Sequence, residues 1–166
     1  MKIGITYDLK NERPLRPGDP PDANAELDSE DTINHVARAF ESFGHQVKKI
    51  GNVKNLLRQI ENLDVDIVFN MAEGHFGRNR ESQVPVILEM YGIPFIGADA
   101  LSLGITLDKV VAKKCFIADG IATPRYFAVR NSRNLEQLNH IGFPLIVKTT
   151  FEGTSDRKST RLNSSH

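Results

Sequence analysis

Lys148 stands at the end of a short apolar run, and small and hydroxyl-bearing residues follow it at 149–155. A lysine ammonium is a compact positive charge that suits a phosphate group. A glycine such as Gly153 lets backbone N–H groups approach phosphate oxygens, and hydroxyls add donors. The pattern therefore suits a polyphosphate, although an ordinary strand end with a turn has the same appearance. It is not a Walker A loop, which requires Gly-x-x-x-x-Gly-Lys-Ser/Thr.

A second group of lysines lies upstream on a predicted helix. Lys109 and Lys113 are four residues apart and share one helix face, and Lys114 is next to them. A solvated basic face has the same spacing, so the pattern alone leaves surface and phosphate-binding interpretations open.

A third group follows a predicted buried strand. The segment Asn70-Met-Ala-Glu-Gly74 continues into a loop with Arg78, Arg80 and Glu81. Glycines and paired charges at this place are typical of a ligand-contacting loop, and also of a helix entry with exposed charges. Elsewhere, Cys115 is interpreted as a small buried apolar residue in a helix. The histidines lack metal-ligand spacing, so no metal ligands are predicted.

The elements that must position these residues alternate regularly in the first hundred residues. Strands are predicted at 2–7, 45–50, 66–70 and 93–96, with helices around 33–40, 53–60 and 84–91. This alternation predicts a parallel sheet with helices on its faces. Ligands of such sheets lie beyond the carboxyl ends of the strands, so we expect chemistry in the loops after Tyr7, Asn70 and Ile96. The loop at 8–28 contains four prolines.

The pattern changes after residue 100. A helix is predicted at 106–118, a strand at 123–129, a helix at 132–142 and a strand at 144–149. We therefore predict one domain at 1–100 and the start of another at 101–155. Residues 156–166 resemble a translated sequencing adapter, so we interpret them as a non-native tail. The natural sequence is then expected to break off at Ser155, inside a longer gene.

Composition narrows the class of protein. The 166 residues carry 21 basic and 21 acidic side chains, so no charge excess points to nucleic acid or an anionic membrane. No apolar run approaches the ~18 residues of a membrane span, and a signal segment is lacking. One cysteine excludes an intramolecular disulfide framework. We expect a cytoplasmic protein.

Taken in order, these motifs resemble the D-alanine–D-alanine ligase family of the ATP-grasp superfamily. The matching segments are Val68–Gly74, Glu81–Pro85, Leu88–Gly97, Leu107–Lys109, Gly120–Pro124 and Pro144–Ser155. The resemblance covers Met1 to Ser155. It implies an α/β fold, in which an N-terminal Rossmann-like parallel sheet (the pre-ATP-grasp domain) precedes a truncated α+β ATP-grasp subdomain.

The resemblance also implies an activity. Such ligases use ATP and Mg²⁺ to join two amino acids through an acylphosphate, in peptidoglycan precursor synthesis. The implied partners are small amino-acid substrates, with neither nucleic acid nor membrane, and a homodimer of the complete protein.

Individual residues acquire roles by the same resemblance. Lys109 and Lys148 match the two lysines that contact the ATP phosphates. Glu152, Gly153, Thr154 and Ser155 match the start of the flexible loop that closes over the phosphates. Within that loop, Glu152 and Gly153 are assigned to nucleotide binding, and Thr154 and Ser155 to catalysis.

Two departures from the family pattern concern the amino-acid site. The family's Glu-His-Glu-Val-Ser stretch is replaced here by Asn24 to Asp31, where Glu26 is the stand-in for the residue that binds the substrate ammonium. The family's histidine before glycine is Glu73, a carboxylate that can pair with an ammonium but cannot donate as histidine does. Another ATP-grasp ligase with different amino-acid substrates is therefore an alternative.

A rival from another class is a non-catalytic α/β ligand-binding module of the flavodoxin or receiver type. Receiver domains require clustered acidic residues after the first strand, where this chain has Asp8 alone. Such a module would also need its complete sheet within 166 residues.

The resemblance predicts that the chain alone is inactive. It places the magnesium carboxylates, the catalytic arginine and half of the ATP site beyond Ser155, and phosphoryl transfer depends on these groups. We expect the purified chain to release no phosphate from ATP in the presence of Mg²⁺ and amino acids. Release above the protein-free rate in a phosphate assay would contradict this expectation.

Overall fold

The computed structural model describes residues 1–19, 23–129, 144–151 and 161–162. For residues 161 and 162 only the backbone is described. The chain divides into two compact units, Met1–Gly104 and Ile105–His166, and each is described by itself.

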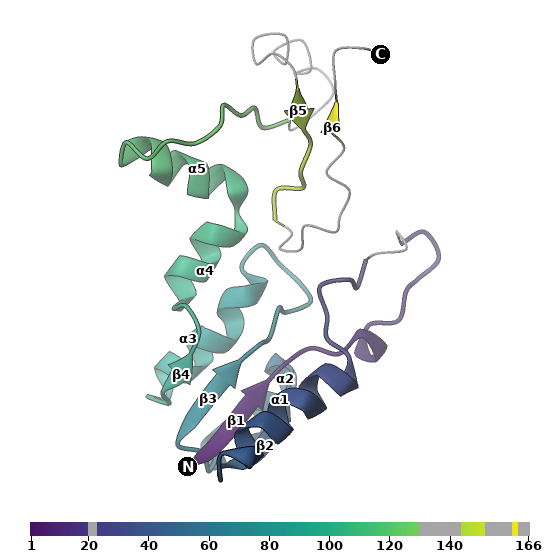
Figure 1. Ribbon diagram of the computed structural model, residues 1–166, viewed down its shortest axis with the longest axis vertical. Coiled ribbons are helices and arrows are strands. Elements are labelled where there is room, and N and C mark those ends of the chain that lie inside the picture. Colours follow the sequence, from purple (N-terminus) through teal and green to yellow (C-terminus); the bar gives the residue numbers. More distant parts are fainter. Residues whose placement is uncertain (20–22, 130–143, 152–160, 163–166) are drawn as a thin grey trace. The chain divides into compact units, whose positions relative to one another are not determined.

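The first unit is built on a parallel sheet with strand order β2-β1-β3-β4 (Figure 1). The strands are β1 (Lys2–Thr6), β2 (Gln46–Gly51), β3 (Ile67–Asn70) and β4 (Phe95–Ile96). The central strand β1 pairs in parallel with both β2 and β3, and β3 pairs in parallel with β4. The parallel α/β sheet that the alternating pattern predicts is therefore confirmed.

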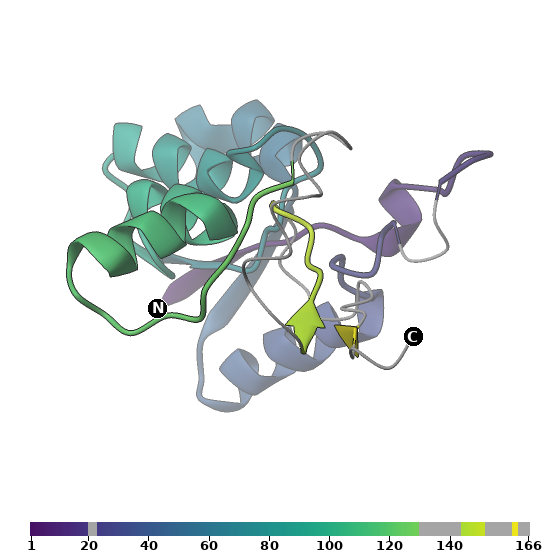
Figure 2. The same ribbon diagram turned by 90° about the horizontal axis from the view of Figure 1, so that it is seen from above.

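Helices cover both faces of this sheet. In Figure 2, α1 (Glu30–Ser42) lies on one side of the strands, while α2 (Val53–Gln59) and α3 (Gln83–Met90) lie on the other. The side chain of Ser29 begins α1 by accepting a hydrogen bond from the Thr32 amide at 3.1 Å. On the α1 side, the rings of Phe40 and Phe69 meet edge to face with centroids 5.3 Å apart.

Buried apolar side chains lie on both faces of the sheet, and one apolar cluster lies on the side of α2 and α3. Leu56, Val68 and Leu88 are fully buried there and belong to one apolar cluster. Gly4 on the central strand leaves room for this packing, because a Cβ at that position would lie 2.5 Å from Ile50 Cδ1 and would make that side chain shift. Burying each large apolar side chain stabilises the fold by about 1.5–3 kcal/mol. This packing fixes the edge at which the strands end.

The second unit departs from the sequence expectation in three places. The helix predicted at 106–118 is instead two helices, α4 (Ala100–Leu107) and α5 (Lys109–Ala118). They meet at Asp108, whose buried carboxylate caps α5 by accepting from the amides of Val110 and Val111. The strand predicted at 123–129 is wrong, because those residues form no strand.

The predicted strand at 144–149 shrinks to β5 (Leu145–Ile146), which pairs antiparallel with β6 (Arg161–Leu162). The latter strand falls in the segment predicted to be a non-native tail. The predicted helix at 132–142 lies outside the described residues.

None of the helices in the described part of the chain has the length and apolar character that crossing a bilayer requires.

Two adjacent leucines of α2 test where the core lies. Leu56 is 0% exposed and Leu57 is 54% exposed. Leu56→Ala should lower the free energy of unfolding by about 2–5 kcal/mol because it leaves a cavity. Leu57→Ala, the matched control, should change it by less than about 0.5 kcal/mol. Urea denaturation followed by circular dichroism measures both, and equal losses would contradict this placement of the core.

Candidate functional site

The loops that follow β1 and β3 start side by side at the carboxyl edge of the sheet. Thr6 pairs with Asn70 in the strand register, and the Thr6 hydroxyl donates a hydrogen bond to Asn70 Oδ1 at 2.7 Å. The amide of Met71 donates to the Thr6 carbonyl at 2.9 Å. The expectation of chemistry beyond these strand ends therefore leads to two adjoining loops.

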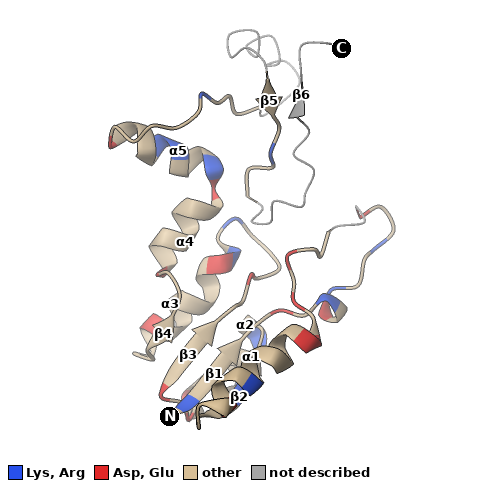
Figure 3. Ribbon diagram, viewed as in Figure 1, with Lys and Arg blue, Asp and Glu red and all other residues tan. Residues whose placement is uncertain are grey.

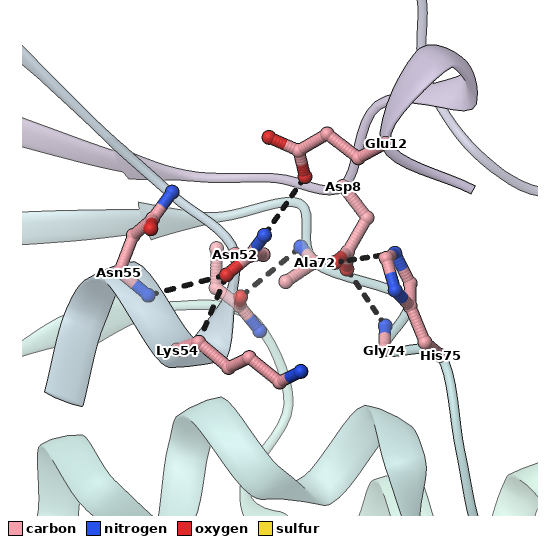
Figure 4. Close-up of polar contacts among 9 residues, drawn as sticks. Asp8, Glu12, Asn52, Lys54, Asn55, Ala72, Gly74 and His75 are labelled. Atoms are coloured by element: carbon pink, nitrogen blue, oxygen red, sulfur yellow. Dashed lines mark hydrogen bonds and ion pairs between the residues drawn. The ribbon is translucent and has the colours of Figure 1, made fainter. Parts of the chain in front are cut away.

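Asp8 joins these two loops. Its side chain is 2% exposed, and Oδ2 accepts a hydrogen bond from the Gly74 amide at 2.8 Å (Figure 4). Gly74 has a φ of +69°, and a Cβ there would lie 2.6 Å from the Arg80 carbonyl oxygen. Only glycine fits this turn without strain. The loop after β3 thus has a backbone path that Asp8 and the Gly74–Arg80 contact hold.

The backbone of Asp8 also holds the segment that carries Glu26. The Asp28 amide donates to the Asp8 carbonyl at 2.9 Å, and the Lys10 amide donates to the Asp28 carbonyl at 3.0 Å. The end of the long 8–28 loop is therefore brought back to the start of that loop. Sequence reasoning selected Glu26 for substrate binding, and this return places it beside the loop after β3.

Arg80 is the centre of a buried charged cluster. One of its guanidinium nitrogens lies 2.6 Å from Glu26 Oε2 and 3.7 Å from Glu81 Oε1. The side chains of Arg80 and Glu26 are 9% and 10% exposed, and that of Glu81 is 15% exposed. Arginine suits such a position because its planar fork of donors meets several carboxylate oxygens.

Glu73 is the third carboxylate of this cluster. Burial raises its pKa to about 7, and the charges of Glu81 and Glu26 add to the increase, while Arg80 lowers it in part. A hydrogen bond with Glu81 also favours the protonated acid. Three carboxylates are therefore gathered beside Arg80, and the charges of Glu81 and Glu26 favour a proton on Glu73. Such a site favours a proton or a cationic ligand.

The structure thus unites two residues that sequence reasoning assigned separately to the amino-acid site, Glu26 and Glu73. Arg80 and Glu81, which complete the cluster, were singled out only as charges of a loop. Figure 3 shows acidic and basic residues together at the entry to α3. Glu26 and Arg80 are 54 residues apart in the sequence. No pattern in the sequence indicates that these residues meet.

In the second unit, one backbone hydrogen bond relates the two predicted phosphate-binding segments. The amide of Lys109, the first residue of α5, donates to the Thr150 carbonyl at 3.1 Å. Thr150 is two residues beyond Lys148, which is exposed. The start of α5 therefore adjoins the chain that follows β5.

Lys113, the other lysine of that helix face, has a structural role. Its ammonium donates to the Thr123 hydroxyl at 2.8 Å and the Pro124 carbonyl at 2.7 Å, and it lies 5.4 Å from the centroid of the Tyr126 ring. The predicted loop residues Glu152, Gly153, Thr154 and Ser155 lie outside the described residues.

Comparison with known proteins identifies relatives of the chain. No family model matches it. A D-alanine–D-alanine ligase of Pelagibacter ubique is 31% identical over 134 residues, which are 78% of this chain and 43% of that protein. The ligase of Xanthomonas axonopodis pv. citri is 29% identical over 73% of this chain and 39% of its own length. The uncharacterised protein y4sG of Sinorhizobium fredii is 34% identical over 72% of this chain and 38% of its own length.

Solved structures agree in fold. The D-alanine–D-alanine ligase of Bacillus anthracis matches with a TM-score of 0.65 and 25% identity, over 92% of this chain and 47% of that one. VanG, a D-Ala:D-Ser ligase of Enterococcus faecalis, matches in fold with a TM-score of 0.59 and 18% identity, over 93% of this chain and 53% of that one.

The chain thus matches the N-terminal portion of these ligases in sequence and fold. Within that class it is related to the D-alanine–D-alanine ligases, and it spans about two fifths of the length of the curated relatives that it matches.

The raised pKa of Glu73 can be measured directly. Between pH 4.5 and about 7 the folded protein holds a proton that the unfolded chain has released, so this group makes the protein less stable as the pH rises through that range. Glu81→Gln should lower the pKa of Glu73, because it removes a nearby negative charge. Carboxyl NMR titration measures the pKa, and an unperturbed Glu73 would contradict the cluster. Denaturation at several pH values with Glu73→Gln should lose this component.

Proposed function

We propose that the complete protein carrying this chain is an ATP-dependent carboxylate–amine ligase that joins two amino acids. The observation that carries the proposal is the buried cluster of Glu26, Glu73 and Glu81 around Arg80, at the carboxyl edge of a parallel sheet. Several carboxylates gathered at one buried place suit the ammonium of an amino acid. The related ligases of known name support the reaction class.

The chemistry proceeds through an acylphosphate. The carboxylate of the first amino acid attacks the γ-phosphorus of ATP, and ADP is the leaving group. The amine of the second amino acid then attacks the carbonyl carbon of the acylphosphate and loses a proton. Phosphate departs, and an amide bond remains. Mg²⁺, when bound with ATP, neutralises charge on the phosphates. The residues of this chain contribute binding and orientation.

In this proposal, Glu26 and Glu73 receive the ammonium of the first amino acid. Arg80 holds Glu26 in place through the 2.6 Å contact, so it orients the carboxylate that would receive the ammonium. An ammonium beside Glu73 would favour its ionised form, so substrate binding is expected to release a proton.

The phosphates of ATP are assigned to Lys109 and Lys148. The backbone bond from Lys109 to Thr150 supports this assignment, because it brings the segments of both lysines next to each other. The residues Glu152, Gly153, Thr154 and Ser155 are proposed to close over the phosphates, which would exclude water from the acylphosphate.

The proposal further includes a division into a substrate domain at 1–100, the start of an ATP-grasp domain at 101–155 and a non-native tail at 156–166. It also includes Mg²⁺, a cytoplasmic location, a role in peptidoglycan precursor synthesis and a homodimeric complete protein.

The pair of amino acids is a separate question. Glu73 stands where the family resemblance expects a histidine, and a carboxylate accepts hydrogen bonds where protonated histidine donates them. A ligase for amino acids other than D-alanine is therefore the second candidate. A panel of D- and L-amino acids, assayed for phosphate release by the complete protein, distinguishes the two.

Variants of the complete protein separate the two proposed roles. Glu26→Gln should raise the KM for the first amino acid at least tenfold and leave the KM for ATP unchanged. Lys109→Ala should raise the KM for ATP at least tenfold, because a phosphate contact is lost. Lys114→Ala, an exposed lysine of the same helix, is the matched control and should change neither.

Coupled ADP-release kinetics give both constants for each variant. An unchanged KM for ATP in Lys109→Ala would remove the nucleotide assignment. A Glu26→Gln protein with unaltered amino-acid kinetics would remove the substrate assignment.

A further inference from the structure

Asp8, Glu12 and His75 form a second polar cluster, which the proposed ligase chemistry does not use (Figure 4). Each offers one ligand atom, and these atoms all lie within 4.8 Å of one another. The three residues come from separate places: the loop after β1, the 3₁₀ turn Lys10–Glu12 and the loop after β3. The fold thus assembles two carboxylates and an imidazole at one point.

The two carboxylates are oriented by bonds on their outer side. Asp8 Oδ2 accepts from the Gly74 amide, which leaves Oδ1 toward His75. Glu12 Oε2 accepts from the Asn52 side-chain amide at 2.8 Å. Asn52 is itself fixed, because its Oδ1 caps the start of α2. Metal ligands in proteins are characteristically held by outer hydrogen bonds of this kind.

The imidazole supplies an independent indication of a ligand. His75 Nε2 is buried and has no hydrogen-bond partner among the described residues, although it lies 3.1 Å from Asp8 Oδ1. That separation therefore lacks the geometry of a hydrogen bond. Its ion-pair partner is thus another member of the cluster, and a cation between the two atoms would satisfy both.

The spacing suits coordination. Ligand atoms at about 2.0–2.2 Å from a zinc ion in tetrahedral geometry lie about 3.3–3.6 Å from each other. The 3.1 Å between His75 Nε2 and Asp8 Oδ1 needs only a small adjustment to meet this value. Glu12 is exposed and is held by Asn52 through Oε2, so its carboxylate can turn about that bond to cover the remaining distance.

We propose that Asp8, Glu12 and His75 bind a divalent transition-metal ion of the Zn²⁺ type. An imidazole with two carboxylates favours such an ion over Mg²⁺, which prefers oxygen ligands alone. The ion would fasten the loop after β1 to the loop that carries Glu73. It would be distinct from the Mg²⁺ that accompanies ATP, and the inference does not depend on the ligase assignment.

The test uses the 166-residue chain without an affinity tag. Zn²⁺ is titrated calorimetrically, and Co²⁺ is added as a spectroscopic probe of the ligand set. We expect one equivalent of Zn²⁺ to bind, and Co²⁺ to give visible absorption bands. His75→Gln and Glu12→Gln should each weaken Zn²⁺ binding at least tenfold. His35→Gln, an exposed histidine of α1, is the matched control and should bind Zn²⁺ as the unaltered chain does.

Unchanged affinity in both site variants, or no Zn²⁺ binding by the unaltered chain at millimolar concentration, would overturn the proposal. Circular dichroism establishes that each variant is folded. If His75→Gln fails to fold, Glu12→Gln decides, because Glu12 is exposed and contributes little to packing. A rise of the thermal midpoint with Zn²⁺ in the unaltered chain, reduced in Glu12→Gln, would support the site.

Discussion

A buried carboxylate that accepts a hydrogen bond from a backbone amide holds the loops at the carboxyl edge of this sheet together. Asp8 bonds Gly74 through its side chain and Asp28 through its backbone, so both ends of the 8–28 loop and the loop after β3 meet at one residue. A charge at 2% exposure is costly unless such bonds satisfy it. The path of the loop after β3, and with it the position of Glu73 and Arg80, depends on that interaction.

Around this anchor the protein gathers three carboxylates at one place. Arg80 contacts two of them, Glu26 and Glu81, and burial together with the charges of Glu81 and Glu26 raises the pKa of Glu73. A protein selected for stability alone would favour apolar replacements for buried ions. Gathering carboxylates makes physical sense where a cationic group arrives from solution, as the ammonium of an amino acid does in the proposed function.

Much of the fold could be predicted, because hydrophobic periodicity reports burial directly. The strand and helix alternation of the first hundred residues was such a case. The break between α4 and α5 at Asp108 was not predicted, because the capping role of Asp108 depends on geometry that residue spacing does not reveal. The predicted strand at 123–129 was wrong because a strand needs a partner, which local sequence cannot supply. Glu26 and Glu73 were selected by resemblance, whereas their meeting at Arg80 is a property of the folded chain alone.

The hydrogen bond from Lys109 to Thr150 has an evolutionary consequence. Both of its atoms belong to the main chain, so every replacement at these positions other than proline at 109 leaves it intact. Side chains around it can be substituted during evolution, and ligand specificity can change, while the spacing of the two segments stays the same. Specificity can therefore change without disturbing the backbone that positions the segments of Lys109 and Lys148.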